Sequence, residues 1–345
     1  MAKIKLNSTE IAKLAGFSRS TVSRVINGYS NVPKATRDKV MKIIEEYEYY
    51  PSFSGQVLAG KKTQTIGLFW VSSGTISYDM QSSSFVTHII ESAAKQGYLV
   101  LTCIVPNLKD SEHQNQIKRI FLQERVDAGI FVGLNNNEPF VKELISWDKI
   151  IGIFDYYNDN ANPNLITVNF ENETGEKVID YVHSLGHRKV ALIDGNMSRF
   201  SSFQRHEGFI RGMLKYQIEM RREWMHYGDV IEQGGYYATK DLIRYSEELP
   251  TIICANNDAV AFGAYHALSE AGVSIPDQVS VIGIDGHERG KLINPQLTTF
   301  SFNFETLFSS LVSRVVAAIE GRNEGRNDEI ITSTLIERTS CKEMK

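Results

Sequence analysis

Apolar residues recur at helical spacing near the start of the chain. The first predicted helix covers residues 8–14, with Ser8 or Thr9 as its cap, and Gly16 ends it in a tight turn. Ser18 is expected to cap a second helix, which ends at Gly28. Two short helices joined by a glycine turn form a helix-turn-helix pattern.

A third helix is expected from Lys34 to Tyr47, with its apolar residues on one face. The pair Tyr50-Pro51 breaks it, because the residue before a proline avoids helical backbone angles. The helices of this segment are expected to close a small core, made of Ile11, Ala12, Ala15, Val22, Val25, Val40 and Ile44.

The remainder of the chain alternates between strand-like and helix-like patterns. Strands are expected at 66–71, 98–105, 128–133, 150–155, 165–170, 189–195, 223–228, 251–256 and 279–285. Helices are expected near 84–96, 111–124, 138–147, 173–185, 202–216, 235–245 and 258–271. This alternation predicts two doubly wound α/β lobes. Ligands bind outside the carboxyl ends of the strands in such sheets, so a binding site is expected in the cleft between the lobes.

These patterns divide the chain into a helical headpiece (1–49), a linker (50–63) and a large α/β domain (64–345). Lobe 1 of the large domain is expected to comprise about 64–160 and 292–322. Lobe 2 is expected to comprise about 161–291 and 323–340.

The distribution of charge separates the headpiece from the large domain. Residues 1–62 hold eleven Lys/Arg and five Asp/Glu, a net charge of +6, whereas the remainder carries 26 basic and 36 acidic residues, a net charge of -10. This asymmetry suggests that only the headpiece meets a polyanion. The three cysteines are far apart, and no apolar run is long enough for a membrane span or a secretory signal, so a cytoplasmic location without a metal cofactor is expected.

The second helix would place its first residues on base edges if it entered the major groove of DNA. Arg19, Ser20 and Arg24 would then face the bases, since Arg bonds guanine bidentately. Phosphate contacts would suit Ser18, Thr21, Ser23, Asn27, Lys34, Thr36 and Arg37. The alternative is that these residues only solvate or cap the helices, above all Ser18.

Polar residues at the ends of predicted strands converge on the cleft. Asp155, Asn257 and Asp285 follow three strands, and Arg205 lies near the start of a helix. A carboxylate, a guanidinium and an amide around one cleft can clamp a polyol, whose hydroxyls each need a donor and an acceptor. The alternatives are that Asp258 caps the helix after it, Asp285 is a turn residue and Arg205 pairs with Glu207 on the surface.

The headpiece resembles the LacI/GalR family of bacterial regulators. The stretch EIAKLAGFSRSTVSRVINGYSNVPKATRDKV carries the resemblance in its A-G-x-S-x-x-T-V-S-R-V-x-N core. In the large domain, LGHRKVALIDG, RHEGFIRGM, CANNDAVAFGAYHALSEAGVSIPDQVSVIGIDG, NPQLTTF and TLIERTS are also similar to the family. The resemblance implies a two-lobed, periplasmic-binding-protein-like α/β effector domain, with effector contacts at Asp155, Arg205, Asn257 and Asp285. Phe85, and Phe302 or Phe304, would lie near the cleft.

The same resemblance implies that the linker is a hinge helix that orders on DNA. Leu58 occupies the place of the leucine that wedges into the central base step in the minor groove. Ser52 stands where asparagine is common in the family, and Gly55 where alanine is frequent. Glycine disfavours a helix interior by about 1 kcal/mol, so we expect this hinge to be harder to order.

Alanine at position 55 is therefore expected to tighten operator binding several-fold. The reason is that less free energy is spent on ordering the hinge helix. Fluorescence anisotropy with labelled operator DNA measures the effect, and an unchanged dissociation constant would contradict it.

The resemblance as a whole implies a repressor that binds a pseudo-palindromic operator as a homodimer and responds to a sugar or sugar phosphate. Departures bear on the ligand: residues 72–84 replace the usual Asn-Pro turn, Val230 stands where an aromatic is frequent, and Asn256 where a smaller residue is common. An enzyme is disfavoured, because neither G-x-G-x-x-G after a strand nor G-x-x-x-x-G-K-[ST] occurs and the eight histidines lack H-E-x-x-H spacing. A transport binding protein is disfavoured by the headpiece, whereas control by a protein corepressor stays open.

Overall fold

A computed structural model describes residues 6–50, 60–72, 80–157, 162–322 and 329–344. The chain forms two compact units, Met1–Thr63 and Gln64–Lys345, here called the headpiece and the body. The hinge-helix predictions for Ser52, Gly55 and Leu58 lie outside the described residues.

The headpiece contains α1 (Ser8–Ala15), α2 (Arg19–Ile26) and α3 (Lys34–Glu46). The cap of α1 is Asn7, so the prediction of Ser8 or Thr9 was wrong by one or two residues. Asn7 accepts hydrogen bonds from the backbone N–H groups of Thr9 and Glu10, while the Glu10 carboxylate accepts from the Asn7 N–H. This reciprocal capping box satisfies three donors at once, which neither hydroxyl residue could do from inside the helix.

The turn between α1 and α2 follows the predicted chemistry. Gly16 has a left-handed backbone angle of 72°, and its N–H bonds back to α1. Ser18 then caps α2 by accepting from the Thr21 N–H at 3.1 Å. The buried core consists of Ile11, Ala12, Ala15, Val22, Val25, Val32 and Val40, with Ile44 packed against it. Val32, from the loop before α3, was not predicted.

The body contains two mixed α/β layers, each built on a six-stranded sheet within the described residues. The lobe 1 sheet has the order β11-β5-β4-β3-β1-β2, with strands β1 (Thr65–Val71), β2 (Leu99–Val105), β3 (Ala128–Val132), β4 (Ile150–Phe154), β5 (Leu165–Phe170) and β11 (Glu329–Ile331). The lobe 2 sheet has the order β12-β10-β9-β8-β6-β7, with strands β6 (Val190–Asp194), β7 (Met225–Tyr227), β8 (Ile252–Ala255), β9 (Ser280–Asp285), β10 (Thr298–Ser301) and β12 (Thr334–Ile336). Neighbouring strands are parallel except β12, which runs antiparallel to β10.

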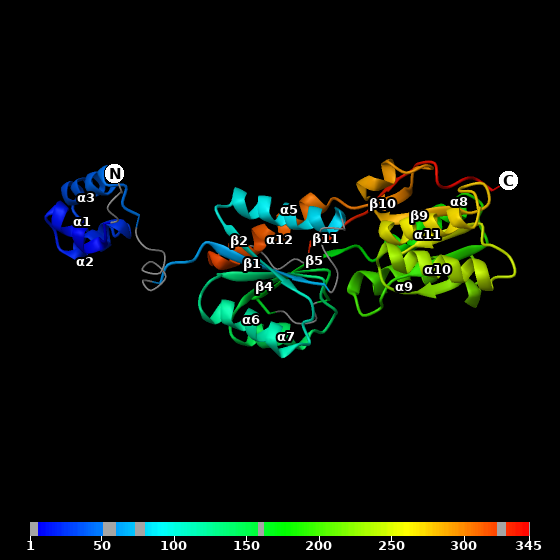
Figure 1. Cartoon of the computed structure of the whole chain (residues 1–345), viewed down its shortest axis with the longest axis horizontal. Coiled ribbons are helices and arrows are strands. Elements are labelled where there is room, and N and C mark those ends of the chain that lie inside the picture. Colours follow the sequence, from blue (N-terminus) through cyan, green and yellow to red (C-terminus); the bar gives the residue numbers. More distant parts are fainter. Residues whose placement is uncertain (1–5, 51–59, 73–79, 158–161, 323–328, 345) are drawn as a thin grey trace. The chain divides into compact units, whose positions relative to one another are not determined.

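Helices cover both faces of each sheet (Figure 1). In lobe 1, α5 (Met80–Lys95) packs with α12 (Phe304–Ile319) on one face, while α6 (Ser111–Leu122) and α7 (Pro139–Ser146) lie on the other. In lobe 2, α8 (Thr174–Ser184) packs with α9 (Phe200–Lys215), and α10 (Glu232–Tyr245) with α11 (Asp258–Glu270). No helix in the described ranges is both long and apolar enough to cross a membrane.

The strand pairing corrects the predicted lobe boundaries. β5 was assigned to lobe 2, but it pairs with β4 in the lobe 1 sheet. β10 was assigned to lobe 1 and pairs with β9 in lobe 2, while β11 was assigned to lobe 2 and pairs with β5 in lobe 1. The predicted boundaries followed sequence proximity, whereas sheet membership is decided by which edge a strand can hydrogen-bond. The chain therefore crosses between the lobes after β5, after β10 and after β11.

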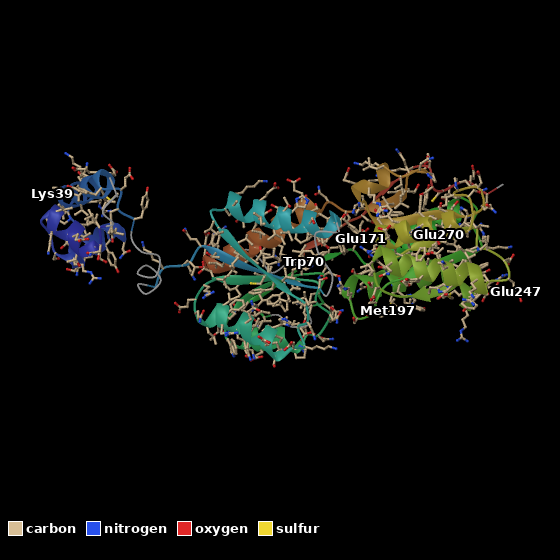
Figure 2. All side chains as sticks on the ribbon, viewed as in Figure 1. Lys39, Trp70, Glu171, Met197, Glu247 and Glu270 are labelled. Carbon is tan, nitrogen blue, oxygen red and sulfur yellow. The ribbon has the colours of Figure 1, made fainter. Side chains whose placement is uncertain are left out.

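A hydrogen-bonded cluster ties two of these crossings together. Glu171, which follows β5 and is labelled in Figure 2, is 7% exposed. Its carboxylate accepts from the Lys177 Nζ at 2.7 Å and from the backbone N–H of Ser333, between β11 and β12, at 2.8 Å. The lysine and these donors lower the pKa of Glu171 against the opposing effect of its burial.

One hydrophobic cluster runs through both lobes. It joins the α5–α12 face of lobe 1 to the α8–α9 face of lobe 2. Aromatic rings link the two parts at the crossings: Phe170 contacts Phe302 with ring centroids 4.2 Å apart, and Phe85 contacts Phe304 at 4.6 Å. These rings form the base of the space between the lobes.

Candidate functional site

The exposed face of α2 is polar and basic. Val22 and Val25 are buried in the headpiece core, so the opposite face of the helix carries Arg19, Ser20, Ser23 and Arg24, all exposed. This is the face that a second helix of a helix-turn-helix presents to a DNA groove.

Several predicted DNA contacts also have partners within the headpiece. The Ser18 hydroxyl lies 2.8 Å from the Ser20 hydroxyl in addition to its capping bond. Asn27 donates to Ser23, and the Arg37 guanidinium donates to the Tyr29 carbonyl at 2.7 Å. Arg19 donates to Ser8 at 3.1 Å.

Other predicted contacts have free polar ends. Arg24 and Lys34 are exposed, and no side-chain hydrogen bond holds either of them in the described headpiece. Thr36 is half-buried at the start of α3. The Thr21 hydroxyl, at the start of α2, is not free, because it lies 2.9 Å from the Ser18 hydroxyl. Leu58 lies outside the described residues.

A cavity of about 260 Å³ lies between the two lobes of the body. It is lined by all the residues predicted to bind the effector: Phe85, Asp155, Arg205, Asn257, Asp285 and Phe304. Sequence segments as distant as α5 and β9 therefore meet at one place, at the carboxyl ends of the strands.

Arg205, on α9, is the central charged group of this cavity. It is 6% exposed, and its Nη2 donates to Asp285 Oδ1 at 2.8 Å, while its Nη1 donates to the Asn256 carbonyl at 2.8 Å. The guanidinium also lies over the ring of Phe170, 5.2 Å from the centroid. Its Nε is buried with no hydrogen-bond partner, so one donor of the fork remains available. The alternative of a surface pair with Glu207 is not what the structure shows.

Asn256 connects Arg205 to a second buried network. The Asn256 side chain donates to Asp194 at 2.8 Å, and the other Asp194 oxygen lies 2.7 Å from His206 Nδ1. The hydrogen bond to Asp194 raises the pKa of His206. Asn256, a departure from the family pattern, thus orients the carbonyl that receives Arg205.

Asp155 bridges the two lobes. It follows β4 of lobe 1 with a left-handed backbone angle of 62°, which turns its side chain toward lobe 2. There its carboxylate accepts from the Ser201 N–H at 2.6 Å and from the Ser201 hydroxyl at 2.7 Å. Burial raises the pKa of Asp155 despite these donors.

The start of α11 differs from the prediction by one residue. Asn257, rather than Asp258, caps the helix by accepting from the Val260 N–H at 2.8 Å. Its amide donates to the Val230 carbonyl, so both ends of Asn257 are used within lobe 2. Asp258 is instead 1% exposed and accepts from Thr299 and from the His287 N–H, and burial raises its pKa to about 8.

The three phenylalanines take different places. Phe85 and Phe304 line the cavity, whereas Phe302 lies beneath Arg205, 5.8 Å from its guanidinium, and is 5% exposed. Only the first two can contact a ligand directly. Val230 also lines the cavity and offers a small aliphatic wall instead of a ring.

Among the lining residues that the sequence analysis missed, three lie close together in the chain. Arg199, Ser201 and Ser202 come from the start of α9, just after β6. The rule that ligands bind beyond strand ends would have included them, because the predicted strand KVALIDG ends four residues before Arg199.

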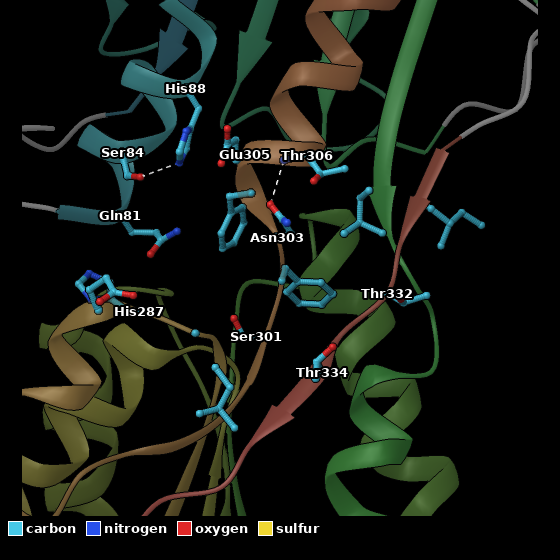
Figure 3. Close-up of a pocket in the computed structure, with 17 residues that line it drawn as sticks. Gln81, Ser84, His88, His287, Ser301, Asn303, Glu305, Thr306, Thr332 and Thr334 are labelled. Carbon is cyan, nitrogen blue, oxygen red and sulfur yellow. Dashed lines mark hydrogen bonds between the residues drawn. The ribbon is translucent and has the colours of Figure 1, made fainter. Parts of the chain in front are cut away.

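A second, larger cavity of about 940 Å³ lies beside the crossings (Figure 3). Ser84 and His88 of α5 are hydrogen-bonded to each other on its wall, and Asn303 is turned to the Thr306 N–H that it caps. Of the residues predicted near the effector, only Phe304 and its alternative Phe302 line it. The smaller cavity, which holds the buried charged groups, is therefore the candidate effector site. No group of three metal-ligating side chains occurs in the described ranges.

Known proteins share these features along most of the chain. Residues 9–52 match the model described as bacterial regulatory proteins, lacI family, and residues 179–341 match the periplasmic binding protein-like domain. The HTH-type transcriptional repressor PurR of Actinobacillus pleuropneumoniae serotype 3 is 31% identical over 301 residues, covering 87% of this chain and 85% of that protein. PurR of Vibrio parahaemolyticus is also 31% identical, with coverages of 87% and 86%.

Solved structures agree in fold. The Lac repressor dimer bound to operator and the anti-inducer ONPF superposes with a TM-score of 0.81 at 25% identity, covering 98% of this chain and 99% of that chain. The complex of the transcriptional regulator CelR with cellobiose gives a TM-score of 0.74 at 21% identity, covering 97% and 99%.

Proposed function

The chain belongs to the LacI family of bacterial regulatory proteins, a family of DNA-binding transcription regulators, and we propose that it represses a carbohydrate-utilisation operon. In this proposal, a sugar or sugar phosphate bound between the lobes of the body controls its affinity for operator DNA. The buried pair of Arg205 and Asp285 in the interlobe cavity is the observation that supports an effector site most directly.

The headpiece would bind DNA as one of two copies. The α2 face would enter the major groove, and two headpieces of a homodimer would read a pseudo-palindromic operator in the bacterial cytoplasm. The Lac repressor, which resembles this chain over nearly its full length, is a dimer on its operator. The proposal includes no catalytic activity, since the relatives compared are repressors.

The cavity would act on DNA binding through the lobes. Asp285 and Arg205 belong to lobe 2 and Asp155 to lobe 1, so a ligand that hydrogen-bonds all of them changes how the lobes fit together. A coupling free energy of about 1–3 kcal/mol between effector and operator is enough for a regulatory response.

The chemistry of the cavity favours a sugar over a purine. The curated relatives are named PurR, but Val230 gives this cavity no ring at that position to stack on a base. Carboxylates and guanidinium donors around an aliphatic and phenylalanine wall instead fit the alternating hydroxyls and apolar face of a sugar. The CelR structure holds cellobiose in the same fold.

Titration of a sugar and sugar phosphate panel against the protein bound to DNA from its own promoter region tests the proposal. Specific DNA binding at low salt, altered by one class of sugar, would support it. The absence of specific DNA binding would overturn the regulator, and DNA binding that no small molecule alters would favour a protein corepressor.

Alanine substitutions at Arg19 and Lys34 are expected to weaken operator binding in different ways. Arg19→Ala should relax discrimination at one base pair by about 1–3 kcal/mol, because a bidentate base contact is lost. Lys34→Ala should weaken binding to all sequences alike, because one phosphate contact is lost. The slope of the logarithm of the binding constant against the logarithm of the salt concentration should fall in magnitude by about 1. Anisotropy titrations on operator and scrambled DNA at several salt concentrations measure both; equal salt slopes for Lys34→Ala and the unmodified protein would contradict the second assignment.

A further inference from the structure

The charges that line the interlobe cavity are unequally partnered. Arg205 is paired with Asp285, and Asp258 is hydrogen-bonded within lobe 2. Arg199, the residue that precedes α9, also lines the cavity, yet its guanidinium has no hydrogen bond or ion pair in the described part of the chain. Its Nη2 points toward lobe 1, 3.9 Å from where a side chain on Gly133 would begin. Its charge acts on the Asp155 carboxylate, whose pKa it lowers without a direct contact. A half-buried guanidinium that makes no hydrogen bond of its own is suited to a bound anion.

The start of α9 adds donors beside Arg199. This helix has 16 residues and no side-chain cap, so no side chain of its own segment satisfies its first-turn N–H groups. Helix N-termini of this kind attract anions. The Ser202 hydroxyl, on a residue 1% exposed that lines the same cavity, has no hydrogen-bond partner at all. That unpartnered, buried hydroxyl is an independent sign that the position accepts a polar group absent from the protein itself.

An anion from the protein already occupies part of this position. The Asp155 carboxylate takes the N–H and the hydroxyl of Ser201, across the boundary between the lobes. Burial raises the pKa of Asp155, so its charge is held there at the expense of solvation. Neighbouring contacts join the same two segments: the Ser198 carbonyl accepts from the Asn136 N–H at 2.9 Å, and the Ser198 hydroxyl donates to Asn135 at 2.8 Å. The Asp155 carboxylate thus occupies the anion position at the start of α9, and its hydrogen bonds also connect the two lobes.

We propose that the N-terminus of α9 is a phosphoryl-binding subsite, in which Arg199, Ser201 and Ser202 hold an anionic group of the effector in exchange for Asp155. This inference rests on the proposed effector site and narrows its ligand to a phosphorylated, monosaccharide-sized molecule. The cavity volume of about 260 Å³ supports the size, since it lies near the lower end of ligand cavities, about 300 Å³.

This exchange would couple the charge of the effector to the contacts between the two lobes. A phosphoryl group bound at Ser201 removes the Asp155 bond, so lobe 1 loses one attachment to lobe 2. A neutral sugar would leave that bond in place. The subsite would therefore let the protein respond to the phosphorylated form of a sugar and ignore the free sugar.

Binding of inorganic phosphate to the full-length protein tests the subsite. Isothermal titration with phosphate, against chloride at matched ionic strength, is expected to show saturable binding. Arg199→Gln and Ser202→Ala should weaken it at least tenfold and several-fold, respectively; Ser202→Ala removes a hydroxyl with no partner and so spares the fold. Arg222→Gln, which removes an exposed guanidinium elsewhere in lobe 2, is the matched control and should bind phosphate as the unmodified protein does. Asp155→Asn should bind phosphate more tightly, because the competing charge is gone.

Further measurements distinguish failure of the subsite from failure of the proposed function. Sugar phosphates should bind more tightly than inorganic phosphate and displace it; if none does, the position binds a free ion only and the effector assignment fails. Equal phosphate binding by Arg199→Gln and the unmodified protein, or no binding beyond chloride, would overturn the subsite. If a neutral sugar nevertheless shifts operator binding, the proposed function stands without the subsite, whereas loss of specific operator binding would overturn the proposed function itself.

Discussion

Alanine at position 205 is expected to abolish the response of operator binding to the effector and to destabilise the body by about 3–5 kcal/mol. The Arg205 guanidinium is 6% exposed and is the partner of Asp285 and of the Asn256 carbonyl. Its removal takes the Arg205 counter-charge away from the half-buried Asp285 carboxylate, and breaking an ion pair by removing one partner is strongly destabilising. It also removes the main donor to a ligand in the cavity.

A second substitution separates these two effects. Asp285→Asn added to Arg205→Ala removes the stranded charge, so the free energy of unfolding should recover by a large part of the loss. The effector response should stay absent. Arg211→Ala, on the same helix but in an exposed pair with Glu176, is the control and should change stability by about 1 kcal/mol or less. Urea unfolding and operator anisotropy with and without effector measure both quantities; an effector response retained by the stable double variant would remove Arg205 from the site.

Asparagine at position 258 is expected to stabilise the body progressively as the pH rises. Burial, with Asp285 nearby, raises the pKa of Asp258 to about 8, from 3.8 in an unfolded chain. The folded state therefore keeps a proton that the unfolded state loses, so the carboxyl's contribution is fully present below pH 3.8 and is lost as the pH rises toward 8. At about 1.4 kcal/mol per pH unit, the difference approaches roughly 6 kcal/mol above pH 8. Asparagine resembles the protonated carboxyl in shape and cannot ionise.

Urea unfolding of the two proteins between pH 5 and 9 gives the measurement. The unmodified protein should lose stability relative to Asp258→Asn from pH 5 to about pH 8, and the difference should level off above pH 8. Asp277→Asn, at an exposed position on the surface of lobe 2, serves as a control for loss of one carboxylate. Parallel stability curves for the unmodified protein and Asp258→Asn would show that the carboxyl is ionised in the folded state.

Local sequence patterns predicted the positions of the helices and strands well, but they predicted less well which strands pair with each other. The capping serine at position 18 and the left-handed Gly16 followed from short-range hydrogen bonding and backbone sterics, which depend on a few neighbouring residues. The one-residue errors at Asn7 and Asn257 arose where adjacent residues could all cap, because the choice depends on which backbone angle the rest of the fold imposes. Lobe membership of β5 and β10 depends on long-range strand pairing, which no local pattern records.

The candidate site divides in the same way. Asp155, Arg205 and Asp285 could be placed at strand or helix ends, and the family resemblance narrowed them further. The pairing of Arg205 with Asp285 could not be predicted, because α9 and β9 are eighty residues apart and meet only through the lobe 2 sheet. Arg199 carries no motif. Its interest comes from a guanidinium that makes no hydrogen bond in the described part of the chain, which only the structure reveals.

The segment that contains β11 and β12 has a consequence for synthesis of the protein. Residues 329–336 give an edge strand to each sheet, so both lobes depend on the same short stretch of chain. A ribosome making this protein must translate residues 329–336 before either sheet can be completed. Until then β5 and β10 would present open edges, which readily pair with other chains. The nascent body thus passes through an interval in which both sheets are present with one edge strand missing from each.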